Sequence, residues 1–174
     1  MLESITARYP RNRRNTSAQN TRYSSGTSAL ASRPAGFDHT LGDELLRPTA
    51  IYSPAILALL AEVGVKGLSH VTGGGIPENL GRILPTGVGA AIDAAAWPRP
   101  PIFDLIAAEG PVDAAEMYRT FNMGIGMIAV VAPADAAATP ALLERAGHRA
   151  FEIGRTVAGE GVTISPPEGG EWKN

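Results

Sequence analysis

Two short segments carry residue types and spacing that suit the binding of a negatively charged ligand. The first, residues 70–79, reads HVTGGGIPEN and lies between an expected strand and an expected helix. Its glycines, Gly73, Gly74 and Gly75, allow the backbone to approach a ligand closely and to take positive φ. The helix start offers free N–H groups and a positive dipole end, beside the hydroxyl of Thr72 and the titratable ring of His70. The segment therefore indicates an anion site. Since no Gly-Lys-Ser/Thr follows, it is not a Walker loop.

The second segment, residues 117–127, reads MYRTFNMGIGM and connects an expected helix to a buried strand. Arg119 near the helix end can hold a carboxylate or a phosphate, and Asn122 in the loop can hydrogen-bond an amide or a hydroxyl. Both segments also fit plain structural roles. The first is equally typical of a tight turn with an incidental histidine. The second is typical of a helix C-cap at Asn122 with glycines in the turn and methionines filling the core.

Hydrophobic periodicity and capping signals predict the elements that position these segments. Helices are expected at 40–46 (capped by Thr40 and ended by Pro48), 53–63 (started by Ser53-Pro54), 77–84, 102–108, 113–120 (capped by Asp113) and 133–146, and strands at 65–71, 88–93, 126–132 and 150–157. The last strand–helix–strand run predicts a βαβ unit with a right-handed crossover. The expected fold class is α+β, a mixed sheet covered by helices with this βαβ unit near the C-terminus.

Composition narrows the functional classes. The chain has 174 residues, the size of about one domain, and contains no cysteine and three histidines. Disulfide scaffolds, cysteine nucleophiles, thiolate zinc and iron–sulfur chemistry are thereby excluded, and no metal-ligating residues are predicted. Apolar runs are too short and broken to span a bilayer. The acidic body lacks a basic stripe, which argues against nucleic acid as a partner.

Charge and composition also divide the chain. Residues 1–36 carry six arginines against one acidic residue, together with thirteen Ser, Thr and Asn, whereas residues 37–174 carry nine basic and sixteen acidic residues. We therefore expect a disordered or aberrant basic segment at 1–36, a folded domain at 37–164 and a loose tail at 165–174. The basic segment fits either a targeting arm or an extension from a misplaced start or frame error.

Taken together, the motifs closely resemble the C-terminal half of the phosphoribosylformylglycinamidine cyclo-ligase (aminoimidazole ribonucleotide synthetase) family. The motifs that carry the resemblance are HxTGGGxPEN at 70–79, WPxPPIF at 97–103 and EMYRTFNxGxGM at 116–127, extended by GxELLxPT at 42–49, Ile153-Gly154 and GEGV at 159–162. The resemblance covers about residues 38 to 164 and implies that family's C-terminal domain fold.

The resemblance implies ATP-dependent ring closure of formylglycinamidine ribonucleotide in purine (IMP) biosynthesis, by a homodimeric ligase. A cytoplasmic location is expected because the sequence shows no secretion signal. It implies catalytic roles for His70, Thr72 and Asn122, and phosphate or substrate binding by Gly73, Gly74, Gly75, Asn79, Arg119, Thr120 and Gly124. ATP and Mg²⁺ are expected to be held mainly by an N-terminal half that is not recognisable in this sequence.

Family chains are about twice as long, and their stretch upstream of residue 37 differs from the one found here. We therefore expect a truncated or frame-damaged product that is inactive alone, unless a separate N-terminal half completes it. The apolar face that would meet that half is expected to be exposed. Two alternatives stay open: another ATP-using relative, such as a selenophosphate synthetase-like or thiamine-phosphate kinase-like enzyme or a hydrogenase-maturation protein, and a non-catalytic phosphate-binding remnant.

Overall fold

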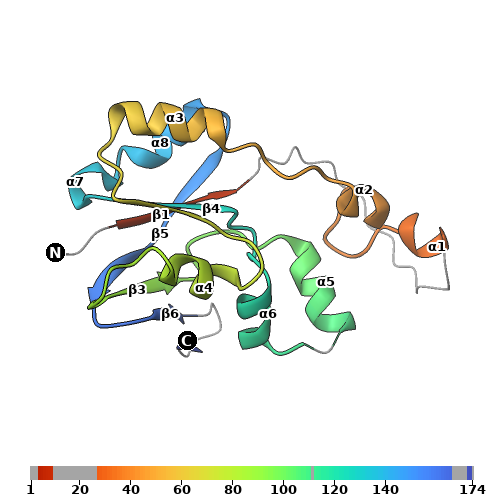
Figure 1. Ribbon diagram of the computed structural model, residues 1–174. Coiled ribbons are helices and arrows are strands. Elements are labelled where there is room, and N and C mark those ends of the chain that lie inside the picture. Colours follow the sequence, from red (N-terminus) through yellow and green to blue (C-terminus); the bar gives the residue numbers. More distant parts are fainter. Residues whose placement is uncertain (1–3, 10–26, 111, 166–171, 174) are drawn as a thin grey trace.

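The computed structural model of the protein describes residues 4–9, 27–110, 112–165 and 172–173 (Figure 1). In chain order the elements are β1 (Ser4–Tyr9), α1 (Thr27–Leu30), α2 (Leu41–Leu45), α3 (Ser53–Glu62), β2 (Gly67–His70), α4 (Gly75–Gly81), β3 (Val88–Asp93), α5 (Pro101–Glu109), α6 (Ala114–Thr120), β4 (Met127–Val131), α7 (Pro133–Ala136), α8 (Thr139–Arg145), β5 (Arg149–Ala158), β6 (Val162–Ser165) and β7 (Trp172–Lys173). None of these helices is long and apolar enough to cross a membrane.

The strands form one mixed sheet in the order β2-β4-β1-β5-β3-β6-β7. Neighbouring strands run antiparallel except β3 and β6, which are parallel. This arrangement confirms the predicted α+β class with a mixed sheet. Apart from the helix expected over 133–146, the expected elements between residues 40 and 157 are present, with ends shifted by a few residues.

The expected βαβ unit is present in modified form. Both β4 and β5 pair antiparallel with β1, so they run parallel to each other with β1 between them. The helix expected over 133–146 is two short helices, α7 and α8. Pro140 lacks the N–H that a continuous helix needs at that point, and the Thr139 hydroxyl instead donates to the Asp135 carbonyl at 2.8 Å.

Residues 1–36 contain regular structure that the sequence pattern did not predict. Ser4–Tyr9 forms β1 inside the sheet, and Thr27–Leu30 forms α1. The six residues SITARY alternate polar and apolar side chains, but the run is short and lies in a segment rich in Ser, Thr and Arg. The strand gains its partners only when β4 and β5 present two open edges to it. The expectation for 10–26 lies outside the described residues. In the expected loose tail, Ser165 ends β6 and Trp172–Lys173 pairs with β6.

Helices cover both faces of the sheet, and each face has its own core. Figure 1 shows α3, α7 and α8 on one side and α4, α5 and α6 on the other. Strand β4 serves both cores by alternation: Ile128 and Val130 face the α4 and α6 side, whereas Ala129 and Val131 face α3 and α8. The sheet is therefore packed on both faces, and it holds in place the loops that leave the ends of its strands.

Two helix starts differ in how they are made. Thr40 caps α2 as predicted, in a reciprocal capping box with Asp43. Helix α3 was expected to be capped by Ser53, but Ser53 is its first helical residue and Tyr52 is the N-cap, with no side-chain hydrogen bond to the cap. Pro54 lies in the first turn, where its missing N–H costs nothing.

Candidate functional site

The two predicted segments lie side by side at one end of the sheet. β2 and β4 pair with His70 opposite Met127, and beyond them the Val71 N–H donates to the Gly126 carbonyl at 3.0 Å. Helices α4 and α6, which follow and precede the two loops, also contact each other. Pairing of strands that lie more than fifty residues apart in the chain thus joins the glycine-rich loop to the 122–126 loop.

The glycine-rich loop has a conformation that requires glycine at two positions. Gly74 is the left-handed N-cap of α4 with φ of 94°, and Gly75 follows with φ of 60°. A Cβ on Gly75 would overlap the carbonyl oxygens of Tyr118 and Phe121 at the end of α6. By contrast, a Cβ on Gly73 would meet nothing within 4 Å. Gly75 is therefore the point at which the two segments touch most closely.

Hydrogen bonds from the Asn79 side chain stabilise the glycine-rich loop. That side chain is buried, and its amide nitrogen donates to the carbonyls of Gly75 at 2.8 Å, Gly73 at 3.1 Å and Thr72 at 3.4 Å. Thr72 is exposed, and its hydroxyl reaches the Asn79 Oδ1 only at 3.5 Å. The geometry thus gives Asn79 a role in shaping the loop and leaves the Thr72 hydroxyl at the surface, within reach of a ligand.

A pair of charges that the sequence analysis did not single out flanks the loop. The Glu78 carboxylate lies against Gly74 and pairs with Arg82 one turn further along α4. The Arg82 guanidinium also donates to the Asn79 Oδ1 at 3.4 Å. The spacing of Glu78, Asn79 and Arg82 by three and four positions on one helix was the signal in the sequence. A bound anion would compete with Glu78 for Arg82.

The facing loop is shaped by its own backbone and by a buried tryptophan. Asn122 Oδ1 accepts a hydrogen bond from the Gly124 N–H at 3.0 Å, and Met123 and Gly124 both have positive φ. The indole of Trp97 donates to the Met123 carbonyl at 2.9 Å. Met117 and Met123 are buried in the core, as the structural interpretation of these methionines expected. Asn122 therefore supports the turn through its oxygen, and its amide nitrogen is the group that can donate to a ligand.

Arg119 and Thr120 lie exposed at the end of α6, and both contact Glu116. Arg119 forms an ion pair with that carboxylate at 3.3 Å, and the Thr120 hydroxyl donates to it at 2.9 Å. Such contacts within one helix are weak at the surface, so a ligand can displace them at little cost.

His70 is exposed at the end of β2, beside the loop that contains Thr72. The Tyr52 ring lies edge-on to it with centroids 5.9 Å apart, and lies 6.2 Å from the ring of His148 on the other side. A Cβ on Gly126 would overlap the Tyr52 hydroxyl, so glycine at that position makes room for the tyrosine. Tyr52, which the sequence analysis did not select, therefore connects the start of α3 to the site.

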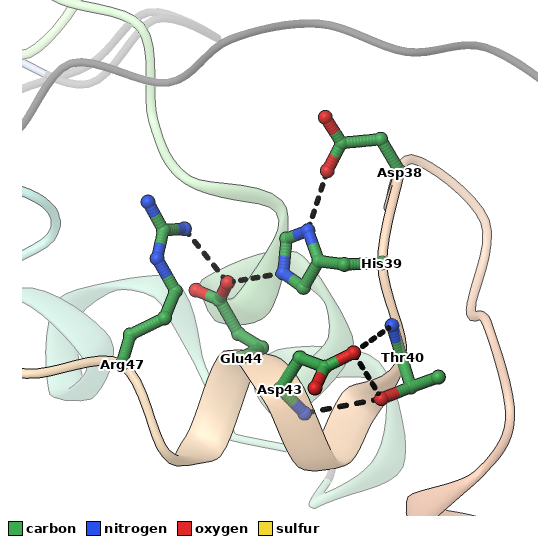
Figure 2. Close-up of polar contacts among 6 residues, drawn as sticks. All are labelled: Asp38, His39, Thr40, Asp43, Glu44 and Arg47. Atoms are coloured by element: carbon green, nitrogen blue, oxygen red, sulfur yellow. Dashed lines mark hydrogen bonds and ion pairs between the residues drawn. The ribbon is translucent and has the colours of Figure 1, made fainter.

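A second polar cluster lies away from this site, around α2 (Figure 2). The His39 ring bridges two carboxylates: Nδ1 contacts Asp38, and Nε2 contacts Glu44 at 2.6 Å. Partial burial lowers the pKa of His39, but the hydrogen bonds and negative charges of Asp38 and Glu44 outweigh this effect and raise it above its ordinary value. Arg47 pairs with the same Glu44 at 2.8 Å. The sequence analysis recognised only the Thr40 cap in this cluster.

The described residues do not form a complete metal site by themselves. Across the part of the chain that the structure describes, no group of three or more His, Cys, Asp and Glu side chains is placed to hold a metal. Near the site, the Glu78 and Glu116 carboxylates pair with arginines of their own helices.

Comparison with known proteins identifies what the chain is similar to. Residues 20–165 match the family described as AIR synthase related protein, C-terminal domain. The chain is 53% identical over 136 residues to a phosphoribosylformylglycinamidine cyclo-ligase of Myxococcus xanthus, covering 78% of this chain and 39% of the relative. A cyclo-ligase of Bacillus cytotoxicus is 50% identical over 125 residues, covering 72% of this chain and 36% of the relative.

A solved structure supports the fold. The crystal structure of E. coli HypE, a hydrogenase maturation protein, aligns with a TM-score of 0.59 and 25% identity, over 77% of this chain and 42% of that chain. The chain spans about two fifths of the length of the curated relatives it matches.

Proposed function

The chain belongs to the family of AIR synthase related proteins, whose C-terminal domain it carries, and on this premise we propose that it forms one wall of the active site of a phosphoribosylformylglycinamidine cyclo-ligase. The observation that carries the proposal is the close contact at Gly75 between the glycine-rich loop and the end of α6, which leads into the 122–126 loop. The proposal places the protein in the cytoplasm and the complete enzyme in a homodimer.

The proposed reaction closes an imidazole ring with ATP as co-substrate. The formyl amide oxygen of formylglycinamidine ribonucleotide attacks the γ-phosphorus of ATP. The bond from that phosphorus to ADP breaks and the amide nitrogen loses its proton, which gives ADP and a phosphoryl imidate. The amidine nitrogen then attacks the imidate carbon, so that a C–N bond forms, the C–O bond to phosphate breaks and a proton leaves the nitrogen. Such chemistry depends mainly on positioning and on neutralising phosphate charge.

We assign the phosphate side of this task to the glycine-rich loop. The Thr72 hydroxyl and the backbone of Gly73, Gly74 and Gly75 would contact the phosphoryl oxygens, and His70 beside them would donate or accept the proton. Arg82 would add a positive charge once the anion displaces Glu78 from it. The exposure of His70 and Thr72 and the position of Arg82 at the loop support these roles.

We assign orientation of the substrate to the facing loop. The Asn122 amide nitrogen and the Arg119 guanidinium would bind polar groups of the ribonucleotide, while Thr120 and Gly124 line the same edge. Both loops rest on buried elements, which supports a geometry that is set before the ligand arrives.

Magnesium and most contacts to ATP fall to the part of the cyclo-ligase that lies outside the matched region. Because the chain spans only about two fifths of its relatives, we propose that it is inactive alone.

A coupled assay of ADP release, with formylglycinamidine ribonucleotide, ATP and Mg²⁺, tests the proposal. We expect no turnover by the chain alone, and turnover when it is co-expressed with the part of the Myxococcus xanthus relative outside the matched region. His70→Ala or Thr72→Val should lower that turnover about 100-fold or more, because each removes a group from the reacting phosphate. Arg145→Ala, an exposed residue of α8 paired with Glu62, should leave it unchanged. Turnover by the chain alone would refute the half-site proposal.

A phosphate-binding domain without ring closure is the second candidate, because the matched relatives are much longer than this chain. Phosphate binding that depends on Thr72, without turnover in any mixture, would favour it. Other members of the wider fold group are less favoured, since identity to HypE is 25% against 53% to the cyclo-ligase.

A further inference from the structure

The ring of Tyr52 lies against the ring of His70, the residue to which the proposed reaction assigns proton transfer. The two rings meet edge to face, with their centroids 5.9 Å apart and an angle of 64° between their planes. Aromatic side chains favour this arrangement. His70 is exposed at the end of β2, and its contact with Tyr52 limits the directions that its ring can take.

The side chain of Tyr52 is itself fixed by several neighbours. Its backbone begins α3, where its carbonyl accepts a hydrogen bond from the Ile56 N–H at 3.0 Å. Its hydroxyl lies so close to Gly126 that a Cβ on that glycine would come within 1.9 Å of the hydroxyl oxygen. The ring of His148 is a further neighbour, with the centroids 6.2 Å apart. The tyrosine ring therefore has little freedom to move.

Gly126 connects both rings to the same point of the backbone. Its carbonyl accepts a hydrogen bond at 3.0 Å from the N–H of Val71, which directly follows His70. Its missing side chain leaves the room that the Tyr52 hydroxyl occupies. Gly126 is buried and leads directly into β4, which pairs with β2. The paired strands therefore set the position of the two rings relative to each other.

We propose that Tyr52 is a positioning residue that holds the His70 ring in the orientation needed for proton transfer, an inference that rests on the proposed function. A histidine side chain at the surface can take three staggered positions about χ1, and these place its ring nitrogens at different points. Proton transfer needs a ring nitrogen within hydrogen-bond reach of the reacting atom. Holding one position in advance removes the entropy cost of selecting it during the reaction.

Kinetics of the completed enzyme test the role of the tyrosine ring. The full chain is co-expressed with the part of the Myxococcus xanthus relative outside the matched region, and ADP release is measured. Tyr52→Leu should lower kcat about tenfold with little change in KM, because the groups that bind the substrate stay in place while the His70 ring does not. Tyr52→Phe keeps the aromatic ring and should restore most of kcat. Leu57→Ala, at a position on α3 that is 67% exposed, is the control and should leave both constants unchanged.

Gly126→Ala moves the tyrosine without altering it. The new Cβ would displace the Tyr52 hydroxyl, so kcat should again fall about tenfold. Tyr52→Leu removes the clashing atoms, so adding Gly126→Ala to it should lower kcat by less than about twofold more. A full tenfold loss in both backgrounds would show that Gly126 acts without Tyr52 and would overturn the proposal.

NMR spectroscopy of the full chain tests the orientation of His70 without turnover, and circular dichroism checks that each variant is folded. Couplings between the Hα and Hβ protons of His70 should show one χ1 position in the unaltered chain and in Tyr52→Phe, and averaging over several in Tyr52→Leu. Averaging in the unaltered chain, one fixed position in Tyr52→Leu, or an unchanged kcat in that variant would overturn the proposal. The expected couplings together with no turnover by the completed enzyme would contradict only the proposed function.

Discussion

The loops of the candidate site and the segment around α2 (residues 38–47) are stabilised by different means. At the site, buried side chains and backbone contacts set the shape: Gly75 touches the end of α6, and Asn79 binds three loop carbonyls. Around α2, ionisable side chains near the surface set the shape. His39 lies between the carboxylates of Asp38 and Glu44, and Asp43 accepts a hydrogen bond from the hydroxyl of the N-cap residue Thr40. The contacts of Gly75 and Asn79 involve no titratable group, whereas those around α2 depend on protonation states.

This difference matters for the proposed function. A reacting phosphate needs groups whose positions do not change when the ligand binds. Helix α2 contains no buried residue, so its capping box and the contacts of His39 hold it in place. The experiments below test the contrast from its largest expected effect to its smallest.

The largest effect should come from Gly75→Ala. The new Cβ would overlap the Tyr118 and Phe121 carbonyls, and alanine is strained at a φ of 60°. We expect the free energy of unfolding to fall by about 3 kcal/mol, measured by chemical denaturation. Gly73→Ala is the matched control, because its Cβ meets nothing within 4 Å, and it should change stability by less than about 0.5 kcal/mol. Similar losses in both variants would contradict the close contact at Gly75.

A smaller loss is expected from Asn79→Ala. It leaves the loop carbonyls of Gly75 and Gly73 without their buried donor, which should cost about 2 kcal/mol of unfolding free energy. Thr72→Ala removes only a long 3.5 Å contact and should cost less than about 0.5 kcal/mol, although it lowers turnover in the completed enzyme. A stability loss in Thr72→Ala as large as that in Asn79→Ala would show that Thr72 shapes the loop instead.

The smallest effect is local and appears as a pH dependence of α2. Since the pKa of His39 is raised in the folded protein, its stabilising contribution is complete below the unfolded pKa and is lost as pH rises through the folded pKa. A neutral ring can donate from only one nitrogen, so either Asp38 or Glu44 then loses its hydrogen bond from the ring. Amide exchange of residues 41–46 should accelerate over that pH range while exchange in β4 stays constant.

His39→Gln should abolish this alkaline loosening. At the acidic side, the Thr40 hydroxyl and then the Thr40 N–H lower the pKa of Asp43 by hydrogen bonding. The contribution of Asp43 is therefore present above its unfolded pKa and is lost as pH falls through the lowered value. Equal acceleration of exchange in α2 and β4 would contradict the separation of the two regions.

Much of the fold and site could be predicted from local sequence. Capping by Thr40 and Asp113, the glycines at 73–75 and the apolar run of β4 depend on neighbouring residues, and the structure confirms the helices and strand that they predicted. The helix expected over 133–146 was wrong because the helix signal of its alanines and leucines masked the break at Pro140. The roles of His70, Thr72, Asn122 and the other residues of the predicted site stay predictions.

The sequence by itself determined the α+β class, the two loop motifs and the family to which they belong. The three-dimensional structure decided which groups meet: β1 between β4 and β5, Tyr52 against His70, and Gly75 against the end of α6. It also decided that Asn79 faces inward while Leu46 and Ile51 face solvent. The physical reason is that propensity and capping act within a few residues. Strand pairing and burial instead depend on segments distant in the chain, whose positions no local pattern records.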